Sequence, residues 1–426
     1  MMGTIIVDYL LAILIDKNRH EEGKCKSIFI LTIILNVSIL GFFKYFGFFV
    51  DNINSIFHLN IPFEGLALPI GISFYTFQVL SYIVDVYLDK VEVQYNIINF
   101  AAYVTMFPQL VAGPIVQYQT IEDQLNTRQE SIVKFGEGVE RFIQGLGKKV
   151  LLANNIGMLW TTVSAMDTSS ISVLTAWLGI IAYTFQIYFD FSAYSDMAIG
   201  LGKMFGFEFM ENFNYPYISK SVTEFWRRWH ISLGTWFREY IYIPLGGNRV
   251  SVPKQVRNIF VVWALTGFWH GANWNNIGWG FYNGVIIATS GFLADTYRSW
   301  KDRLHINDKS KGYHIFMILR TYLLFNLGEY FDCVNSVGEA WKMIRYSLTS
   351  FHPSQFLLIS SGKLGVAYTP YALLTLAIGC LIWFVVSVLK ERGTDMEKAL
   401  SRLPFAVEFL MFLLLLISIP LFSPMS

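Results

Sequence analysis

Long apolar runs recur along this chain and constrain its fold more than any other feature. Examples lie at about 27–50, 66–88 and 171–189, and a transmembrane helix needs about 20 mostly apolar residues. Charged residues make up 15% of the chain and its mean hydropathy is +0.43, whereas soluble domains carry about 25% charged residues. Backbone polar groups inside a bilayer must be paired within their own segment. The sequence therefore predicts an all-α polytopic membrane protein.

About ten transmembrane helices are expected, joined without a polar linker, so that residues 1–426 form a single integral membrane domain. The first run is shorter than a full span. The three cysteines are far apart and predict neither a disulfide framework nor a zinc site. No cleavable signal peptide is evident. The candidate spans are about 3–16, 27–50, 66–88, 150–166, 171–189, 258–276, 277–294, 313–331, 369–389 and 405–424.

Lysine and arginine predict the orientation of these spans, because cytoplasmic loops are enriched in both. Loops 17–26, 298–311 and 390–402 are rich in them and are expected in the cytoplasm, whereas 51–65 and 164–170 contain neither. Segment 97–118 is apolar, but both of its flanks are basic. Pro108 and the pair Gly113-Pro114 interrupt any continuous helix there. We therefore expect 97–118 to be a re-entrant segment that enters from the cytoplasmic side.

The stretch 203–257 is both basic and aromatic. Helical spacing of apolar residues predicts one helix that either lies at the cytoplasmic interface or slants into the bundle. Its stripe comprises Trp226, Trp229, Leu233 and Trp236. Glu224 and Arg228 are spaced as an i, i+4 ion pair. Lys44, a lone cation in LGFFKYFGFF, is expected to extend its charge toward the membrane surface over aromatic faces.

His270 lies in LTGFWHGANW (265–274), and an ionisable residue at bilayer depth is a functional candidate by default. If its span begins near Ile259, His270 lies about 16 Å deep at 1.5 Å per residue, near the middle of a core about 30 Å thick. Burial favours the neutral ring, which can take a proton from a hydroxyl. Asn273 could orient a carbonyl or the ring. The alternative is a buried histidine that only holds two helices together.

Other polar residues allow several interpretations. His230 is either functional or an interfacial side chain that reaches toward water. Asp190 and Tyr194 share a helix face, and the carboxylates of Asp190 and Asp196 could form an ion site, orient a ring or be solvated. Three arginines could bind the phosphates of a donor such as coenzyme A, or anchor the chain at the interface; they are Arg227, Arg228 and Arg238.

Several function classes receive no support from the sequence. GxSxG, Walker and HExxH motifs do not occur, so neither covalent serine catalysis nor metal catalysis has a local signature. The net charge of +1 provides no field that would attract nucleic acid. Neither a bound cofactor nor a metal is expected.

Four motifs, taken in order, make the chain resemble the membrane-bound O-acyltransferase family. The resemblance is strongest to the bacterial alginate O-acetyltransferase-like branch, and the D-alanyl transfer protein of teichoic acid modification is more distant. It runs from about residue 27 to 300. The motifs are MFPQLVAGPIVQY (106–118), YFDFSAYSDMAIGLGKMFGFEFMENFNYPY (188–217), FWRRWHISLGTWFREYIYIPLGGNR (225–249) and GFWHGANWNNIGWGFYNG (267–284).

This resemblance implies an enzyme that moves an acyl group to a hydroxyl. The invariant histidine of the family matches His270, and its second polar active-site position matches His230. Residues in or near the matched motifs are further substrate or tunnel candidates: Asp190, Tyr194, Trp229, Asn273, Trp274, Arg227, Arg228 and Arg238. The implied fold is a ring of about ten transmembrane helices, with re-entrant segments around a central funnel or tunnel.

The resemblance also implies a biological setting. An acetyl group from cytoplasmic acetyl-CoA would pass across the bacterial inner membrane to an envelope polysaccharide, and an extracytoplasmic esterase-like partner would complete the transfer. The family usually has one or two membrane segments before VDYLLAILI, and it often has an arginine where this chain has Asp332. Open alternatives are transfer of D-alanine or another small acyl group, a glycan or lipid transporter with histidine proton relays, and a non-catalytic scaffold.

Overall fold

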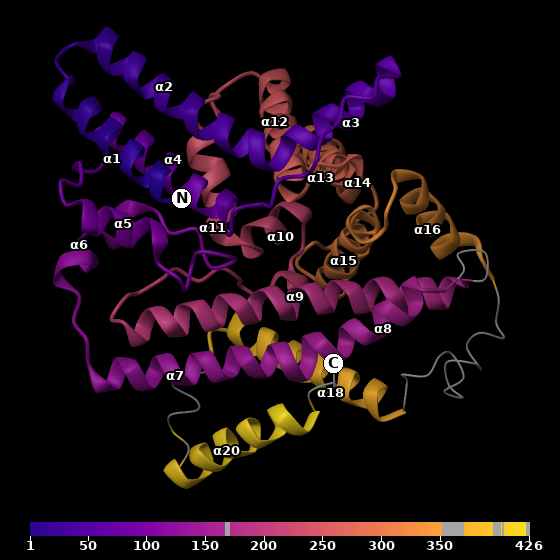
Figure 1. The fold of residues 1–426 in the computed structure, drawn as a ribbon. Helices are drawn as coiled ribbons and strands as arrows, with labels where there is room; N and C mark the ends of the chain where they lie inside the picture. Colours follow the sequence, from indigo (N-terminus) through magenta and orange to yellow (C-terminus); the bar gives the residue numbers. More distant parts are fainter. Residues whose placement is uncertain (167–170, 352–369, 395–401, 403, 423–426) are drawn as a thin grey trace. The chain divides into compact units, whose positions relative to one another are not determined.

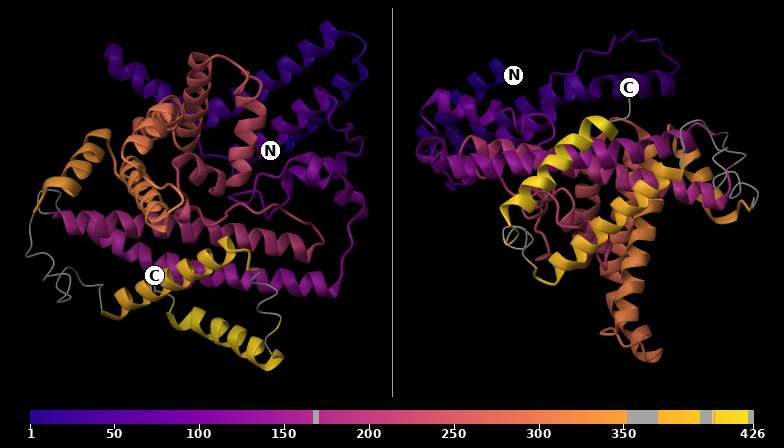
Figure 2. Two further views of the ribbon diagram at one scale, coloured as in Figure 1. Left: turned by 180° about the vertical axis from the view of Figure 1, so that it is seen from behind. Right: turned by 90° about the horizontal axis from the view of Figure 1, so that it is seen from below.

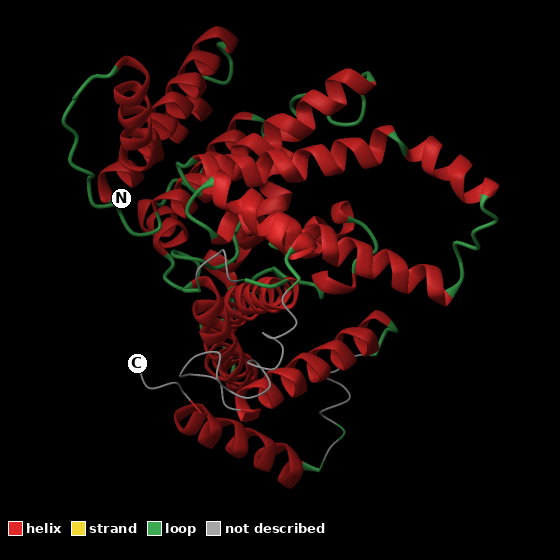
Figure 3. Ribbon diagram, turned by 90° about the vertical axis from the view of Figure 1, so that its right-hand side faces the viewer, coloured by secondary structure: helices red, strands yellow, loops and turns green. Residues whose placement is uncertain are grey.

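The computed structural model describes residues 1–166, 171–351, 370–394, 402 and 404–422. Its regular elements are helices (Figure 3). The described residues contain one isolated bridge, between Phe213 and Trp229. The all-α prediction is therefore confirmed. The chain divides into two compact units, which are described separately below. The expectation of one membrane domain over 1–426 stays a prediction.

Unit 1 comprises Met1–Glu140, Ala198–Asn212 and His230–Asn273. Helices α1 and α2 lie side by side, and α4 packs against both (Figure 1). Asn36 on α2 donates a hydrogen bond to the buried Asp8 carboxylate on α1, at 2.7 Å. Tyr82 and Phe100 are fully buried in the hydrophobic core of this unit. The elements that lie wholly in unit 1 are α1 (Met2–Lys17), α2 (Glu22–Leu40), η1 (Gly41–Tyr45), α3 (Phe46–Phe57), α4 (Ile72–Tyr87), α5 (Ile97–Thr105), α6 (Tyr118–Thr127), α11 (Ile231–Phe237), η5 (Arg238–Tyr242) and α12 (Val252–His270).

Unit 2 comprises Arg141–Met197, Phe213–Trp229 and Trp274–Ser426. Its core is an aromatic cluster that includes Tyr188, Tyr217, Phe225 and Phe325. Helix α13 packs along α15, and α10 contacts both (Figures 1 and 2). The elements that lie wholly in unit 2 are η2 (Lys148–Ala153), α8 (Asn154–Ser164), η4 (Pro216–Ile218), α10 (Val222–Arg228), α13 (Trp274–Phe292), α14 (Ala294–Arg303), α15 (Lys311–Cys333), α16 (Val337–Thr349), α18 (Pro370–Glu391) and α20 (Phe405–Phe422).

Two described helices are long and apolar enough to cross a membrane, Glu22–Phe57 and Val173–Met204. Helices α13 and α14, bent by 60° at their junction, form a third candidate if they count as one span. The predicted spans 27–50 and 171–189 correspond to the first two. The predicted boundary between 258–276 and 277–294 is wrong, because α12 ends at His270 and α13 begins at Trp274.

Several other boundaries differ from the predictions. Helix α3 continues to Phe57, so part of the predicted loop 51–65 is helical. The chain between α5 and α6 is not helical, which confirms the break expected around Pro108, whereas entry of this segment into a membrane stays a prediction. Parts of the predicted loops and spans at 164–170, 369–389, 390–402 and 405–424 lie outside the described residues.

Helices α7 (Ile132–Gly147) and α9 (Val173–Met204) contribute residues to both units. Within unit 1 they approach closely at Gly138, where an added Cβ would lie 2.5 Å from the carbonyl oxygen of Gly200. Gly136, two residues earlier, is exposed and has no atom within 4 Å of that position. The absence of a side chain at Gly138 is therefore what allows the two backbones to approach.

These two glycines provide a matched test of the contact. Alanine is favoured over glycine in a helix by about 0.8–1 kcal/mol, so Gly136→Ala should maintain or raise the unfolding temperature. Gly138→Ala should lower it, because overpacking costs about 1–3 kcal/mol. Thermal unfolding of both purified variants in the same detergent measures the difference. Equal unfolding temperatures would contradict the close approach.

Candidate active site

His230 lies at a break between two short helices, so the single helix predicted within 203–257 is wrong. Helix α10 ends at Arg228, and His230 has a φ of 46°, in the left-handed region. Two backbone hydrogen bonds flank the break. Asn214 N–H donates to the Arg228 carbonyl at 2.8 Å, and Ile231 N–H donates to the Asn212 carbonyl at 2.9 Å. These bonds replace the helical bonds that a continuous helix would have made.

The break separates the predicted stripe into two cores. Trp226 and Trp229 pack in the aromatic cluster of unit 2, and the Trp229 ring stacks on Phe225 with centroids 5.7 Å apart. Leu233 and Trp236 pack in a different cluster, in unit 1. The four residues fill two interiors and do not line one interfacial face. Trp229 is buried, and its role as a tunnel residue stays a prediction.

His230 itself is buried at 4% exposure, which excludes the interpretation that it reaches toward water from an interface. Its Nδ1 lies 3.1 Å from the side-chain oxygen of Asn212. The same oxygen accepts from the backbone N–H of Ser232 at 3.1 Å and from its hydroxyl at 2.9 Å. Ile115 N–H donates to that hydroxyl at 3.0 Å. Three of the four sequence motifs, 106–118, 188–217 and 225–249, therefore contribute residues to the surroundings of His230.

The environment of His230 keeps its ring neutral. Burial, together with the nearby His270, lowers the pKa of His230 to about 3. Desolvation has this effect because it penalises the charged form. At pH 7 the ring is therefore an uncharged imidazole, with one protonated nitrogen and one nitrogen that can accept a proton.

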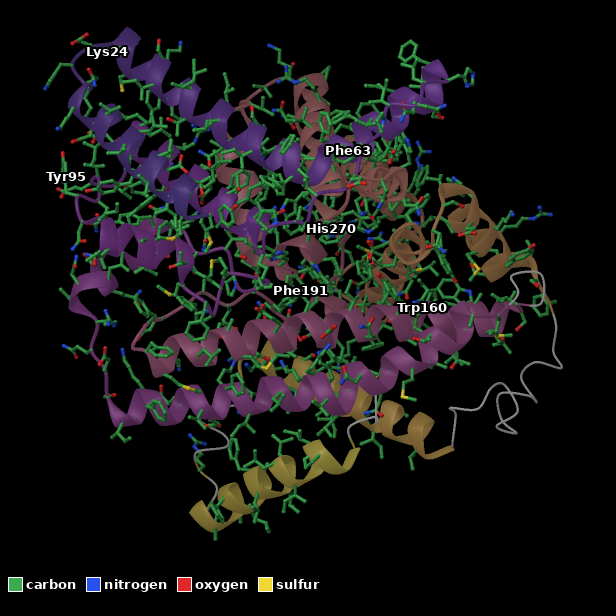
Figure 4. All side chains as sticks on the ribbon, in the orientation of Figure 1. Lys24, Phe63, Tyr95, Trp160, Phe191 and His270 are labelled. Carbon is green, nitrogen blue, oxygen red and sulfur yellow. The ribbon has the colours of Figure 1, made fainter. Side chains whose placement is uncertain are left out.

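His270 (Figure 4) is the last residue of α12. The backbone of Gly271, which follows it, is extended. The His270 side chain is exposed on the surface of the protein, and its depth within a membrane stays a prediction. Because α12 begins at Val252, His270 lies about 27 Å along the helix from its first residue. The centroid of the Trp269 ring lies 5.0 Å from that of the His270 ring and 6.1 Å from that of the His230 ring. The two histidines of the prediction are thus brought to the same tryptophan within unit 1.

The residues after His270 form a short connection to α13. Asn273 is exposed, and its N–H donates to the Gly271 carbonyl at 2.9 Å. Trp274, which is 60% exposed, begins α13 and belongs to unit 2. Their predicted roles toward a substrate stay predictions.

Lys44 is a further component of this site, and its contact with α12 is one that the sequence analysis did not predict. It lies in the π-helical segment η1, and its ammonium group donates to Ser73 Oγ at 3.1 Å and to the Trp269 carbonyl. The ammonium also lies 5.3 Å from the centroid of the Trp269 ring. The expected contact of Lys44 with aromatic faces is confirmed, because its ammonium also lies 5.6 Å from the centroid of the Tyr45 ring. Its extension toward the membrane surface stays a prediction. Its charge stabilises the C-terminal end of α12, where carbonyls lack helical partners and the helix dipole is negative.

The carboxylates of α9 are held by basic residues of unit 2. Asp190 pairs with Lys149, and both side chains are more than a third exposed. Asp196 is buried and pairs with Lys148 and, at 2.6 Å, with Arg141. These pairs favour a structural role over an ion site. Tyr194, one turn after Asp190, is half-buried on the same helix, and its predicted contact with a substrate stays a prediction.

The three candidate arginines differ in their surroundings. Arg228 pairs with Glu224 at 2.7 Å, which confirms the predicted i, i+4 pair, and with Glu391 of α18 at 2.9 Å. The two neighbouring carboxylates neutralise the charge of Arg228, so this side chain is poorly suited to bind an anionic donor. Arg227 is exposed, and Arg238 is exposed beside Glu239, at 3.1 Å. Arg227 and Arg238 are therefore the better placed for an incoming phosphate.

Comparison with known proteins identifies the class to which this site belongs. The family model of the membrane-bound O-acyltransferase family matches residues 74–303, a range that includes Asn212, His230 and His270. The chain belongs to this family, as its motifs predict, and it is a membrane-bound acyltransferase.

Individual relatives carry names from cell-envelope modification. The chain is 40% identical to a probable alginate O-acetylase AlgI of Pseudomonas aeruginosa over 378 residues, 86% of this chain and 70% of the relative. It is 36% identical to a peptidoglycan O-acetyltransferase of Helicobacter pylori over 315 residues, 68% of this chain and 59% of the relative. A teichoic acid D-alanyltransferase of Streptococcus thermophilus is 28% identical over 280 residues, 60% of this chain and 66% of the relative.

The position of Lys44 predicts that its charge supports both stability and activity. Lys44→Met removes a charge-assisted hydrogen bond worth about 1.5–3 kcal/mol. It should lower the unfolding temperature and also reduce acyl transfer, because the end of α12 that carries His270 is no longer held. Lys24→Met, an exposed lysine near the start of α2, serves as the control and should change neither. Full activity and stability in Lys44→Met would contradict the assigned contact.

The two carboxylates of α9 should differ in their contribution to stability. Asp196→Asn leaves two basic groups without their buried counter-charge, and breaking a buried pair costs about 3–5 kcal/mol. Asp190→Asn removes a pair that is more than a third exposed, worth about 0–1 kcal/mol. Thermal unfolding of the two variants should therefore show a large loss only for Asp196→Asn. A larger loss for Asp190→Asn would refute the structural assignment.

Proposed function

We propose that this protein transfers an acetyl group from cytoplasmic acetyl-CoA across the membrane toward hydroxyls of a cell-envelope polysaccharide. The names of its relatives support this proposal, since alginate, peptidoglycan and teichoic acid are envelope polymers. Acetyl is favoured over D-alanyl because the relatives named for O-acetyl transfer are 40% and 36% identical, against 28% for the D-alanyl relative.

The observation that carries the proposal is the pair of histidines beside Trp269, one of them buried and neutral. In the proposed reaction His270 takes the proton of the accepting hydroxyl, whose oxygen then attacks the acyl carbonyl carbon. The bond from that carbon to the donor sulfur breaks, and the thiolate leaves and takes up a proton. His230 orients the substrate or relays that proton. General acid–base assistance of this kind contributes about 10²–10⁴-fold to a rate.

The route of the acyl group forms the second part of the proposal. The donor approaches beside the basic and aromatic segment 220–249, where the exposed guanidinium of Arg227 or that of Arg238 supplies positive charge for its phosphates. A ring of about ten spans encloses a tunnel that lets the small acyl group cross without movement of a whole glycan. We place the protein in the bacterial inner membrane, with an extracytoplasmic esterase-like partner that completes the transfer.

Replacement of His270 tests the function directly. His270→Ala should lower acyl transfer at least about a hundredfold, the lower range of general-base catalysis, while membrane insertion and thermal unfolding stay unchanged. Mass spectrometry of envelope polysaccharide from cells that express each variant measures the product. His20→Ala, an exposed histidine between α1 and α2, is the control and should retain full acylation.

Two other results would each reject the proposal. A transporter would move substrate in a pH-coupled manner and give no acylated product. A scaffold would tolerate His270→Gln with full modification of the envelope.

A further inference from the structure

The hydrogen bonds around Asn212 determine which nitrogen of His230 carries its proton. The Ser232 backbone N–H can only donate, so the Asn212 atom that it contacts is the carbonyl oxygen of the amide. A carbonyl oxygen has no hydrogen to donate. The contact of 3.1 Å between this oxygen and His230 Nδ1 is therefore a hydrogen bond only if Nδ1 is protonated.

The Ser232 hydroxyl does not offer an alternative partner for an unprotonated Nδ1. It lies 3.5 Å from Nδ1, but 2.9 Å from the Asn212 oxygen, to which it donates its single hydrogen. Its oxygen accepts from Ile115 N–H at 3.0 Å. Each of these contacts has one donor and one acceptor when Nδ1 carries the hydrogen.

We propose that Asn212 is a positioning residue that holds His230 in the tautomer with hydrogen on Nδ1 and the lone pair on Nε2. The consequence for catalysis rests on the proposed function. In the resting enzyme His230 takes up a proton only at Nε2, and the imidazolium then releases a proton from the same atom, while the Nδ1 hydrogen stays on Asn212. His230 therefore begins each cycle as a proton acceptor and cannot begin it as a donor from Nε2.

The backbone explains why this arrangement is fixed. The Asn212 carbonyl accepts from Ile231 N–H at 2.9 Å, so the asparagine is anchored by its main chain as well as by its side chain. The left-handed backbone at His230 directs the chain back on itself, and the next residue but one, Ser232, reaches the same asparagine. All of these residues belong to unit 1. The neutral tautomer therefore depends on a short, largely buried network of three side chains.

Nuclear magnetic resonance of ring-¹⁵N-labelled histidine in the purified full-length protein tests the tautomer without a measurement of activity. The His230 signals are identified as those lost in His230→Gln. We expect a protonated Nδ1 and an unprotonated Nε2 at pH 7. A hydrogen on Nε2, or a doubly protonated ring, would overturn the proposal.

Two substitutions of Asn212 separate orientation of the ring from support of the fold. Asn212→Leu removes the acceptor and should give a mixture of tautomers. It should also lower acyl transfer by about 10–100-fold, as is usual when the partner that orients a functional imidazole is lost. Asn212→Asp retains an acceptor for the Ser232 N–H, so a purely structural role predicts that it behaves as the original protein.

A positioning role for Asn212 also predicts a change in the titration of His230 in Asn212→Asp. A carboxylate beside Nδ1–H favours the imidazolium, so the midpoint of the His230 titration, followed by its ¹⁵N signals, should rise by about 1–3 pH units. The titratable neighbour that acts on His230 is His270, and His270→Gln measured in parallel identifies its share. An unchanged midpoint in Asn212→Asp, or a retained Nδ1 hydrogen in Asn212→Leu, would overturn the proposal.

Failure of this inference is distinguishable from failure of the proposed function. If the expected tautomer is found but no variant changes envelope acylation, the function is wrong and the tautomer stands. If acylation requires His270 but the hydrogen lies on Nε2, the function stands and the role of Asn212 is wrong. If Asn212→Leu does not fold, the original protein and Asn212→Asp still decide the question.

Discussion

The geometry of the candidate active site depends on two backbone hydrogen bonds at the break between helices α10 and α11. Asn214 and Ile231 donate on either side of the break between α10 and α11, and the chain satisfies there the polar groups that a continuous helix would have paired. Without the break, His230 would continue the aromatic stripe. With it, the side chain is buried beside Asn212 and near Trp269.

The broad features of the fold could be predicted because they follow from composition and periodicity. Long apolar runs require helices, and the spacing of Glu224 and Arg228 predicts an ion pair that the structure contains. The break at His230 could not be predicted from helical spacing, because the apolar positions stay in phase on both sides of it. The left-handed residue is imposed by contacts with segment 212–214, which is distant in sequence.

The candidate site could be predicted in part. The cost of an ionisable group in a membrane points to His270, and motif resemblance points to both His230 and His270. The structure places both rings beside Trp269. The contact of Lys44 with the end of α12 could not be predicted, because a lone lysine in an apolar helix has two physical solutions. Its flexible chain can extend to the membrane surface, or its charge can meet an unpaired carbonyl. Only the position of α12 distinguishes them, and that position is a tertiary property.

The π-helical segment that carries Lys44 also changes what the two halves of one long helix present. One extra residue displaces the following side chains by about 100° around the helix axis relative to an uninterrupted α-helix. Before it, α2 turns Thr32 and Asn36 inward, and Asn36 meets Asp8 on α1. After it, Phe48 and Phe49 of α3 meet Phe268 on α12. The continuous helix Glu22–Phe57 thereby packs against two different helices, α1 before the π-helical segment and α12 after it. Loss of one residue within 41–45 would rotate Phe48 and Phe49 away from α12, the helix that carries His270.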